Sequence, residues 1–116
     1  MAHDETLYLR HVLDAMDTVE EYLQGVNEEK FKNTRLIQDG VIRQIEIIGE
    51  AVRHVSKNTR KSYPEIPWQD VAGMRDKLIH GYFGVDIEKV WDTARDDLPI
   101  LREQVMGILK DFGQNI

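Results

Sequence analysis

The amino-acid sequence predicts an all-α protein, an up-and-down four-helix bundle with room for a short extra helix. Three observations favour this fold class. Apolar residues recur at intervals of three and four over long stretches, which is typical of amphipathic helices. No stretch alternates strictly between apolar and polar residues as a half-buried strand would, and the connections are short. With 116 residues, the chain is expected to form one helical domain, residues 1–116.

The first helix is predicted from about Asp4 to Gln24. Asp4 is expected to cap its start, and Gly25 is expected to end it in a left-handed conformation. The apolar stripe of this helix contains Tyr8, Leu9, Val12, Leu13, Ala15, Met16, Val19, Tyr22 and Leu23.

The second helix is predicted from Asn27, an expected N-cap, to about Ser56, with a break near 33–34. Val26 and Phe31 have the spacing of a hydrophobic staple across its start. Its stripe contains Ile37, Val41, Ile45, Ile48, Val52 and Val55, with Gly40 and Gly49 inside the helix. Because glycine destabilises a helix interior, each of these two glycines indicates the close approach of another helix.

The segment SKNTRKSYPEIP (56–67) is predicted to be a loop, because it is polar and contains two prolines. The third helix is expected from Pro67, at the first helical position, to about Ile79. Its stripe contains Trp68, Val71, Met74 and Leu78. Arg75 shares the adjoining face with Ala72 and Ile79, so it is expected at the edge of the core.

The fourth helix is predicted to begin after Asp86, an expected N-cap, with Val85 and Val90 as a staple pair. Its apolar pattern keeps its phase through Pro99, so a kink is expected there and not an end. The stripe contains Ile87, Trp91, Ala94, Leu98, Leu101, Val105, Ile108 and Phe112. Both tryptophans, Trp68 and Trp91, are interpreted as core anchors.

Some apolar residues fall outside these stripes, namely Leu36, Ile42, Ile47 and Leu109. A second apolar face on long helices often contacts a partner, so a homodimer is expected.

Charge and composition exclude several classes of protein. The net charge of −6 and the pI of about 5.1 argue against a protein that coats nucleic acid non-specifically, but not against a small site for one phosphodiester. The chain has no cysteine, so it has no disulfide and no thiolate metal site. The first residues lack the apolar core of a signal peptide, and no apolar run reaches membrane-spanning length. A cytoplasmic protein with no membrane partner is expected.

The stretch RDKLIHGYF, from Arg75 to Phe83, has two interpretations. As an ordinary helix end, it places cations near the negative pole of the macrodipole, with His80 over the last carbonyls and Gly81 as the C′ glycine. That interpretation does not account for Tyr82 and Phe83 in a glycine-flanked tip. If the helix instead loosens at His80, its ring can swing back so that a guanidinium, an imidazole and a phenol converge.

Such a set suits a phosphodiester beside a 2′-hydroxyl. An imidazole titrates near neutral pH and can take the proton of the hydroxyl. A guanidinium binds phosphate oxygens through paired donors and stabilises the charge of the transition state. The phenol of Tyr82 can hydrogen-bond the same group or stack on a base. No metal and no cofactor are required, and His3, His11 and His54 lack the spacing of metal ligands.

The pattern Arg-x4-His-x-Tyr, with Arg75, Asp76, His80 and Tyr82, resembles that of the HEPN superfamily. The segments VIRQIEIIGEAVRHVS, YPEIPWQDVAGMRDKLIHGYFGVD and VWDTARDDLPILREQV resemble more closely the HepT-type ribonuclease toxins. The resemblance covers nearly the whole chain, from about Leu7 to Ile108.

The resemblance implies an all-α homodimer in which two motifs face each other across one RNA-cleaving cleft. It implies a metal-independent endoribonuclease toxin of a type VII-like toxin–antitoxin pair. The cognate antitoxin would be an MntA-like nucleotidyltransferase that silences the toxin by adding AMP to the motif tyrosine, Tyr82. The alternative is a non-catalytic dimeric scaffold that binds the same nucleotidyltransferase.

Two further polar groups have open interpretations. Arg43, Glu46, Glu50 and His54 form a stripe on the second helix, most simply a solvated face with intrahelical ion pairs. Either Glu46 or Glu50 could instead lie half-buried beside Arg75 and orient its guanidinium, with Asp76 as a second supporting residue. A basic group follows, made of Arg53, Lys57, Arg60 and Lys61. It is interpreted as a solvated loop that could also guide RNA toward the cleft.

Overall fold

The structure is a computed structural model that describes residues 5–80 and 84–114. Asp4, the expected first cap, therefore lies outside the described residues. The helices in chain order are α1 (Glu5–Leu23), α2 (Glu28–Lys32), α3 (Arg35–Arg53), α4 (Lys57–Ser62), α5 (Trp68–Ala72), α6 (Met74–Leu78), α7 (Ile87–Asp92), the π-helical turn η1 (Thr93–Asp97) and α8 (Leu98–Asp111). Between α6 and α7, β1 (Ile79–His80) pairs antiparallel with β2 (Gly84–Val85).

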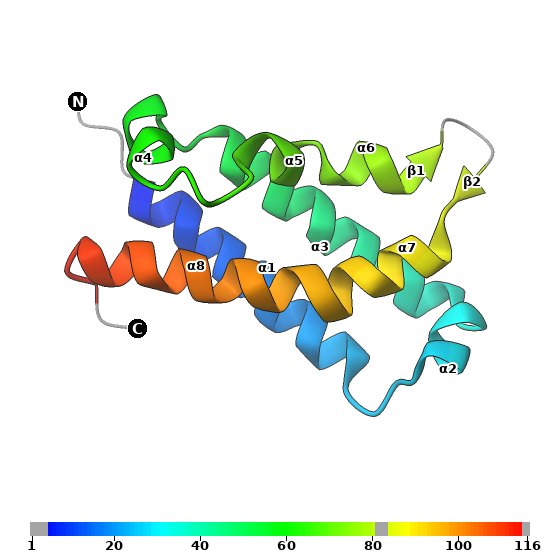
Figure 1. Cartoon of the computed structure of the whole chain (residues 1–116). Coiled ribbons are helices and arrows are strands. Elements are labelled where there is room, and N and C mark those ends of the chain that lie inside the picture. The colour runs from blue at the N-terminus through cyan, green and yellow to red at the C-terminus, as the bar shows by residue number, and fades with distance from the viewer. Residues whose placement is uncertain (1–4, 81–83, 115–116) are drawn as a thin grey trace.

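The predicted all-α bundle is confirmed. Four helical layers pack together: α1, α3, the pair α5–α6, and the continuous run α7–η1–α8 (Figure 1). α1 packs along α3, α8 packs on α1, and α5 and α6 lie against α3. The side chains enclosed most completely are Phe31, Leu9, Ile45, Ile48, Leu78, Ile108, Leu109, Val12, Val41, Val52, Val90 and Val105.

Local signals place the first helix boundaries as predicted. Gly25 has a φ of +72°, the left-handed conformation expected after α1. Asn27 caps α2, since its side-chain oxygen accepts a 2.8 Å hydrogen bond from the Lys30 N–H. The expected break is present, because α2 ends at Lys32 and α3 begins at Arg35.

Both interior glycines of α3 lie where another helix comes close. A Cβ added at Gly40 would lie 2.9 Å from the ring of Tyr22 on α1. A Cβ at Gly49 would lie 3.0 Å from the carbonyl oxygen of Ala72 at the end of α5. Gly49 therefore permits a backbone contact between α3 and α5, which places the start of α6 beside α3.

The prediction of a loop over 56–67 was wrong in part, because 57–62 form α4. Ser56 caps this helix by accepting a 3.2 Å hydrogen bond from the Thr59 N–H. Glu5, at the start of α1, accepts hydrogen bonds from the Ser56 N–H and the Thr59 hydroxyl. A side chain 51 residues away thus stabilises a short helix that its own sequence does not favour.

The third helix is not continuous, although it ends within one residue of the predicted end near Ile79. It starts at Trp68 with Pro67 as the residue before it, and it breaks at Gly73, whose φ of −97° and ψ of +10° are not helical. The second piece, α6, ends at Leu78. The chain then leaves in an extended conformation, and the N–H of Asp86 donates a 2.8 Å hydrogen bond to the Leu78 carbonyl.

The last helix begins at its predicted cap, with the Asp86 side chain accepting a 3.1 Å hydrogen bond from the Lys89 N–H. The helical run passes Pro99 without ending, and the π-helical turn η1 directly precedes it. Pro99 has no N–H to donate to a carbonyl of the preceding turn, so the regular α-helical hydrogen-bond pattern is interrupted there and the turn before it is π-helical. Val85 is 39% exposed while Val90 is buried, and the contact between them stays a prediction.

Two expectations about apolar residues also change. Leu109 was assigned to a surplus face, but it is fully buried in the core. The exposed residue of that set is Leu36, at 83% exposure. Trp68 is buried as predicted, whereas Trp91 is half-buried and packs on the core with its ring centroid 5.4 Å from that of Phe31.

Candidate functional site

A groove of about 520 Å³ runs along α3. Its walls come from α1 on one side and from the α5–α6 segment on the other. The lining residues are Tyr8, His11, Arg43, Glu46, Ile47, Gly49, Glu50, Ala51, Arg53, His54, Ala72, Arg75 and Asp76. We call this surface the α3 groove. It contains four of the candidate residues predicted from the sequence: Arg75, Asp76, Glu46 and Glu50.

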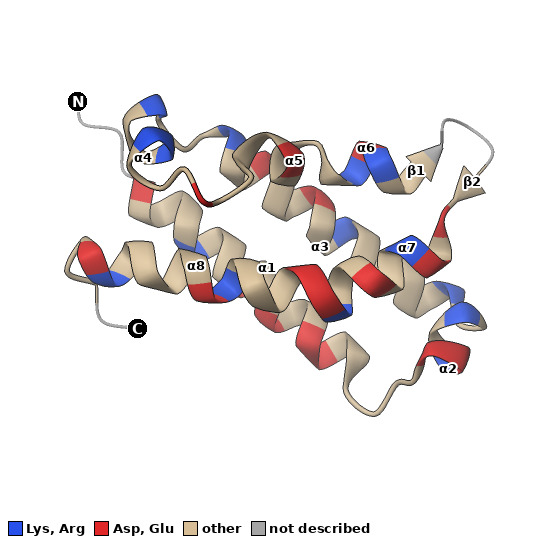
Figure 2. Ribbon diagram, in the orientation of Figure 1, with Lys and Arg blue, Asp and Glu red and all other residues tan. Residues whose placement is uncertain are grey.

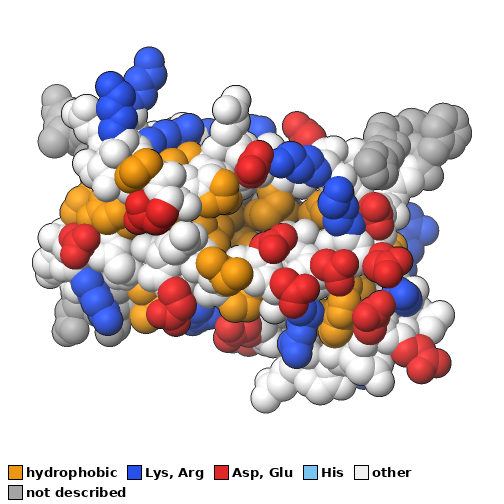
Figure 3. All heavy atoms as spheres, viewed as in Figure 1, with side chains coloured by type: hydrophobic (Ala, Val, Ile, Leu, Met, Phe, Trp, Pro, Cys, Tyr) orange, Lys and Arg blue, Asp and Glu red, His pale blue; other side chains and the backbone are white. Residues whose placement is uncertain are grey.

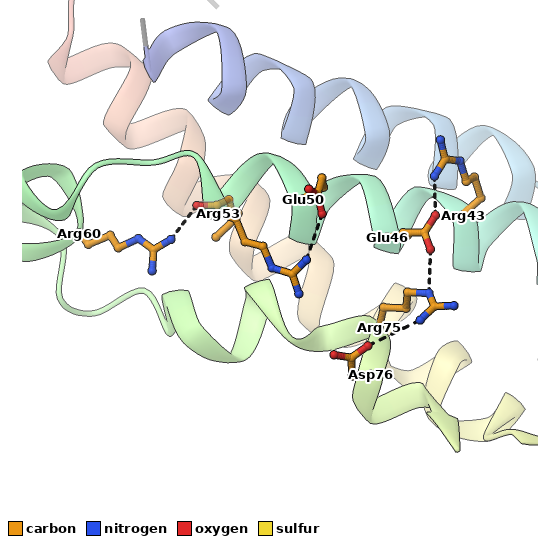
Figure 4. A network of polar contacts seen from close by, with 8 residues as sticks. Arg43, Glu46, Glu50, Arg53, Arg60, Arg75 and Asp76 are labelled. Carbon is orange, nitrogen blue, oxygen red and sulfur yellow. Dashed lines mark hydrogen bonds and ion pairs between the residues drawn. The ribbon is translucent and has the colours of Figure 1, made fainter. Parts of the chain in front are cut away.

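At one end of the α3 groove, Glu46 bridges two arginines. The Nε of Arg75 lies 2.7 Å from Oε2 of Glu46, and the Nη1 of Arg43 contacts the other carboxylate oxygen (Figure 4). Arg43 belongs to α3 and Arg75 to α6, so the carboxylate joins a regular helix to the segment that carries the motif. The sequence left open whether Glu46 or Glu50 would lie beside Arg75, and the structure selects Glu46.

The contact depends on where α5 and α6 lie. Glu46 precedes Gly49 by three residues, so the two share a face of α3. The close backbone approach at Gly49 brings Ala72 against this face. The break at Gly73 then redirects the chain, and Arg75 follows within the first turn of α6 in reach of Glu46.

Solvent reaches this end of the α3 groove. The side chain of Arg75 is 43% exposed and that of Glu46 is 38% exposed. An ion pair this exposed contributes at most about 1 kcal/mol to stability. Its main consequence is therefore geometric: Glu46 restrains the Arg75 guanidinium while leaving part of it accessible to an anion.

The other carboxylates of the α3 groove are also paired. Asp76 Oδ1 lies 3.6 Å from Nη1 of Arg75, and Glu50 Oε2 lies 3.0 Å from Nη1 of Arg53. Asp76 thus contacts the motif arginine as expected for a supporting residue, although its side chain is 73% exposed. Glu50 contacts the next turn of its own helix and not the motif.

The remaining motif residues follow Arg75 directly. His80 is the last residue of β1, whose backbone pairs with Gly84. Its side chain and the whole of Tyr82 lie outside the described residues. The chain leaves the helix after Leu78, two residues before His80 and within one residue of the predicted end. The convergence of His80 and Tyr82 on Arg75 stays a prediction.

At the other end of the α3 groove lies an aromatic cluster that the sequence did not reveal. The rings of Tyr8 and His54 are stacked, with centroids 4.7 Å apart and planes 14° apart. His11 meets Tyr8 edge-on at 6.3 Å. Tyr8 and His11 are three residues apart on α1, so the sequence could place them on one face. Only the packing of α1 on α3 brings His54 to them. His54 is exposed as expected, but it is stacked and not simply solvated.

The basic group after α3 divides into two kinds of residue. Arg60 donates hydrogen bonds to the carbonyls of Val52 (2.9 Å) and Val55 (3.3 Å) and thereby caps the end of α3. Lys57 and Lys61 are exposed on α4, and Arg53 lines the α3 groove. Lys and Arg outnumber Asp and Glu on α4 and α6, whereas Asp and Glu outnumber Lys and Arg on α7 and η1 (Figure 2).

The described part of the chain contains neither a metal-binding cluster nor a membrane-spanning helix. Within residues 5–80 and 84–114, no three or more His, Asp or Glu side chains are grouped so that they could hold a metal ion. None of the helices in these ranges is long and apolar enough to cross a membrane.

Comparisons with known proteins agree on one family. The family model described as "Ribonuclease HepT-like" matches residues 12–108. A protein of Methanocaldococcus jannaschii named "Putative RNase MJ0125" is 43% identical over 109 residues, which cover 94% of each chain. The "Probable ribonuclease HepT" of Thermococcus cleftensis is 42% identical over 95 residues, 82% of this chain and 86% of that protein.

A further relative from Methanocaldococcus jannaschii is about twice as long. It is named "Gamma-glutamylcyclotransferase and putative RNase MJ0434" and is 40% identical over 115 residues. The match covers 99% of this chain but only 52% of that protein. No solved structure matches the chain significantly.

Proposed function

We propose, from the premise that this chain belongs to the ribonuclease HepT-like family, that it is a metal-independent endoribonuclease acting through Arg75, His80 and Tyr82. One observation carries the proposal. Arg75, the first residue of the Arg-x4-His-x-Tyr motif, is held by Glu46 in the α3 groove with its guanidinium partly exposed.

The reaction follows from the chemistry of the three side chains. The His80 imidazole takes the proton of a ribose 2′-hydroxyl, and the 2′ oxygen forms a bond to the adjacent phosphorus. The bond from phosphorus to the 5′ oxygen breaks, and that oxygen takes up a proton from solvent. The products are a 2′,3′-cyclic phosphate and a 5′-hydroxyl. Arg75 binds the non-bridging phosphate oxygens, where negative charge increases in the transition state. Tyr82 hydrogen-bonds the phosphate or stacks on a base.

The active form is proposed to be a homodimer of single-domain chains, with the two motifs facing one shared cleft. The proposal rests on the family resemblance. The described structure also exposes several large apolar side chains on separate elements, and a partner would cover those that lie on the shared face. The exposed side chains are Leu7, Tyr22, Leu36, Val85, Ile100 and Phe112.

Regulation is proposed to act on Tyr82. A cognate MntA-like nucleotidyltransferase would transfer AMP to the phenol oxygen, which forms a phosphodiester and releases pyrophosphate from ATP. The added phosphate would compete with RNA for the Arg75 guanidinium, so the toxin of this type VII-like pair would be silenced without unfolding. The net charge of −6 favours a second candidate, a non-catalytic dimeric scaffold for the same nucleotidyltransferase.

The catalytic proposal is tested by incubating the purified protein with RNA in the presence of EDTA and identifying the new ends. We expect cleavage to persist and to leave 2′,3′-cyclic phosphates. His80→Ala should abolish cleavage and leave the thermal melting temperature unchanged, because the residue lies beyond the core stripe of α6. Lys77→Ala is the matched control, since Lys77 is an exposed cation of the same segment that pairs with Asp70. Chelator-sensitive cleavage, or 5′-phosphate products, would rule out this mechanism.

A second experiment separates the toxin from the scaffold. Expression without the nucleotidyltransferase should arrest growth if the protein is a toxin and have no effect if it is a scaffold. Co-expression should then restore growth and add one or more AMP masses to the peptide that contains Tyr82. Tyr82→Phe should escape this modification. Full silencing of Tyr82→Phe with unchanged mass would show that inhibition works by steric masking.

A further inference from the structure

The α3 groove extends well past Arg75. We infer that the aromatic cluster at its far end, made of Tyr8, His11 and His54, is a nucleobase-binding platform for single-stranded RNA. The inference rests on the proposed ribonuclease function and adds to it where the RNA lies before cleavage.

The placement of the rings carries the inference. Tyr8 and His54 stack at 4.7 Å and 14°, and His11 closes the cluster edge-on to Tyr8. All three line the same groove as Arg75. His11 and His54 are exposed, and Tyr8 is half-buried against the core. A base that enters the groove can therefore extend an existing stack whose inner ring is already anchored.

The distance along α3 suits the length of a short strand. Glu46 marks the Arg75 end of the groove and His54 the aromatic end, and eight residues of helix separate them by about 12 Å. Stacked nucleotides rise by about 3.4 Å each along one strand. A strand with its scissile phosphate on Arg75 would thus place a base on the platform about two to four nucleotides away.

The charges at the two ends fit the backbone of such a strand. Arg43 lies one helical turn before Glu46, Arg53 lies directly before His54, and both line the groove. Their partners, Glu46 and Glu50, neutralise them in the free protein. A phosphate can take over these donors, because the side chains of Arg43 and Arg53 are 64% and 52% exposed. Cations that follow the backbone, combined with aromatic rings that take bases, are typical of single-strand binding sites.

The test measures binding without cleavage, by the fluorescence anisotropy of a labelled, 2′-O-methylated single-stranded oligonucleotide. Tyr8→Leu keeps an apolar side chain on the core but removes the ring, and His54→Ala removes an exposed ring. We expect each variant to bind about tenfold more weakly, as loss of one base–aromatic stack does elsewhere. Tyr8→Phe should bind like the wild type. Tyr63→Leu is the matched control, since Tyr63 is, like Tyr8, a half-buried tyrosine packed against the core, but it does not line the groove.

An abasic version of the same oligonucleotide isolates the role of the bases. It should bind more weakly to the wild type, and neither Tyr8→Leu nor His54→Ala should weaken its binding further. If Tyr8→Leu and His54→Ala lose affinity equally for both oligonucleotides, the platform is overturned. It is also overturned if these substitutions change only the oligomeric state, because the groove would then be a contact between copies of the chain. If the wild type cleaves RNA while both variants bind and cleave as it does, the platform fails and the ribonuclease stands. If the wild type neither binds nor cleaves RNA, both proposals fail.

Discussion

The two halves of the molecule are built differently. In the first half, α1 and α3 are uninterrupted helices of 19 residues each that pack along one another. In the second half the helix breaks at Gly73, the chain then pairs as β1–β2, and the last helical run is locally π-helical at η1. The motif begins in the broken half, but the carboxylate that orients its arginine comes from α3. The two halves therefore contribute differently to the site. The regular helices α1 and α3 provide a rigid support that includes Glu46, and the interrupted segment provides the motif residue Arg75.

The α5–α6 segment also has two unlike sides. Toward α3 it borders the polar α3 groove. Toward α8 it borders a second groove of about 480 Å³, visible as a hollow with apolar side chains at its base (Figure 3). Val71, Met74 and Leu78 reach this second groove from α5 and α6, and Leu98 and Leu101 reach it from α8. The α5–α6 segment thus contacts α3 through its backbone, whereas its side chains leave an open groove between it and α8.

The largest expected effect concerns the cores of the two halves. Ile48→Ala in α3 and Leu78→Ala in α6 remove side chains of similar size, and both positions are almost fully buried. We expect Ile48→Ala to lower the free energy of unfolding by about 2–5 kcal/mol. Leu78→Ala should cost less, because Leu78 borders the second groove and its neighbours have room to collapse. Denaturant unfolding measures both, with Glu103→Ala at an exposed site of α8 as the control. An equal or larger cost at Leu78 would break the comparison.

The next effect tests the link between the halves. Glu46→Gln keeps the shape of the side chain but removes the charge that holds Arg75. We expect kcat to fall about tenfold, equivalent to about 1.4 kcal/mol of transition-state stabilisation, while unfolding by denaturant changes by less than about 0.5 kcal/mol. Glu50→Gln is the matched control, because Glu50 pairs with Arg53 and not with Arg75. Equal losses in the two variants would remove the special role of Glu46.

A pair of glycine substitutions should change stability in opposite directions. Alanine favours a helix by about 1 kcal/mol over glycine. At Gly107 in α8, an added Cβ meets nothing within 4 Å, so Gly107→Ala should stabilise the protein by about 0.5–1 kcal/mol. At Gly49 the Cβ would meet the Ala72 and Val71 carbonyl oxygens at 3.0 and 3.3 Å. These are backbone atoms, so Gly49→Ala should destabilise the protein, shift α5 and lower activity. Stabilisation at Gly49 would show that the α3–α5 contact is loose.

The smallest effect concerns the tie between the segment after α4 and the end of α8. The Tyr63 hydroxyl donates a 2.7 Å hydrogen bond to Asp111, and this bond raises the pKa of Tyr63 to about 12. Since the pKa of Tyr63 in the folded protein lies above the ordinary tyrosine pKa of 10.0, the stabilisation is complete below about pH 10 and is lost as the pH rises toward 12. Tyr63→Phe should cost about 0.5–1 kcal/mol at neutral pH. In an ultraviolet titration, the wild type should show one tyrosine that ionises near pH 12, and this tyrosine should be absent from the Tyr63→Phe variant.

Much of this molecule follows from short-range signals in the sequence. A cap such as Asn27 or Asp86 acts on a backbone N–H three residues away, and Gly25 ends α1 through its own φ. Apolar periodicity likewise depends only on residues within a few turns. For this reason the sequence predicted the helical class and most helix boundaries. The Arg-x4-His-x-Tyr motif is read directly from it. The sequence also restricted the carboxylate beside Arg75 to two candidates.

Tertiary structure decided what depends on segments far apart in the chain. α4 forms because Glu5 reaches Ser56 and Thr59. Glu46 and not Glu50 holds Arg75, because the contact at Gly49 and the break at Gly73 determine where α6 lies. The stacking of His54 on Tyr8 needs α1 beside α3. Each of these contacts joins residues that no local pattern relates, and each exists only because burying the core brings separate helices within a few ångströms of one another.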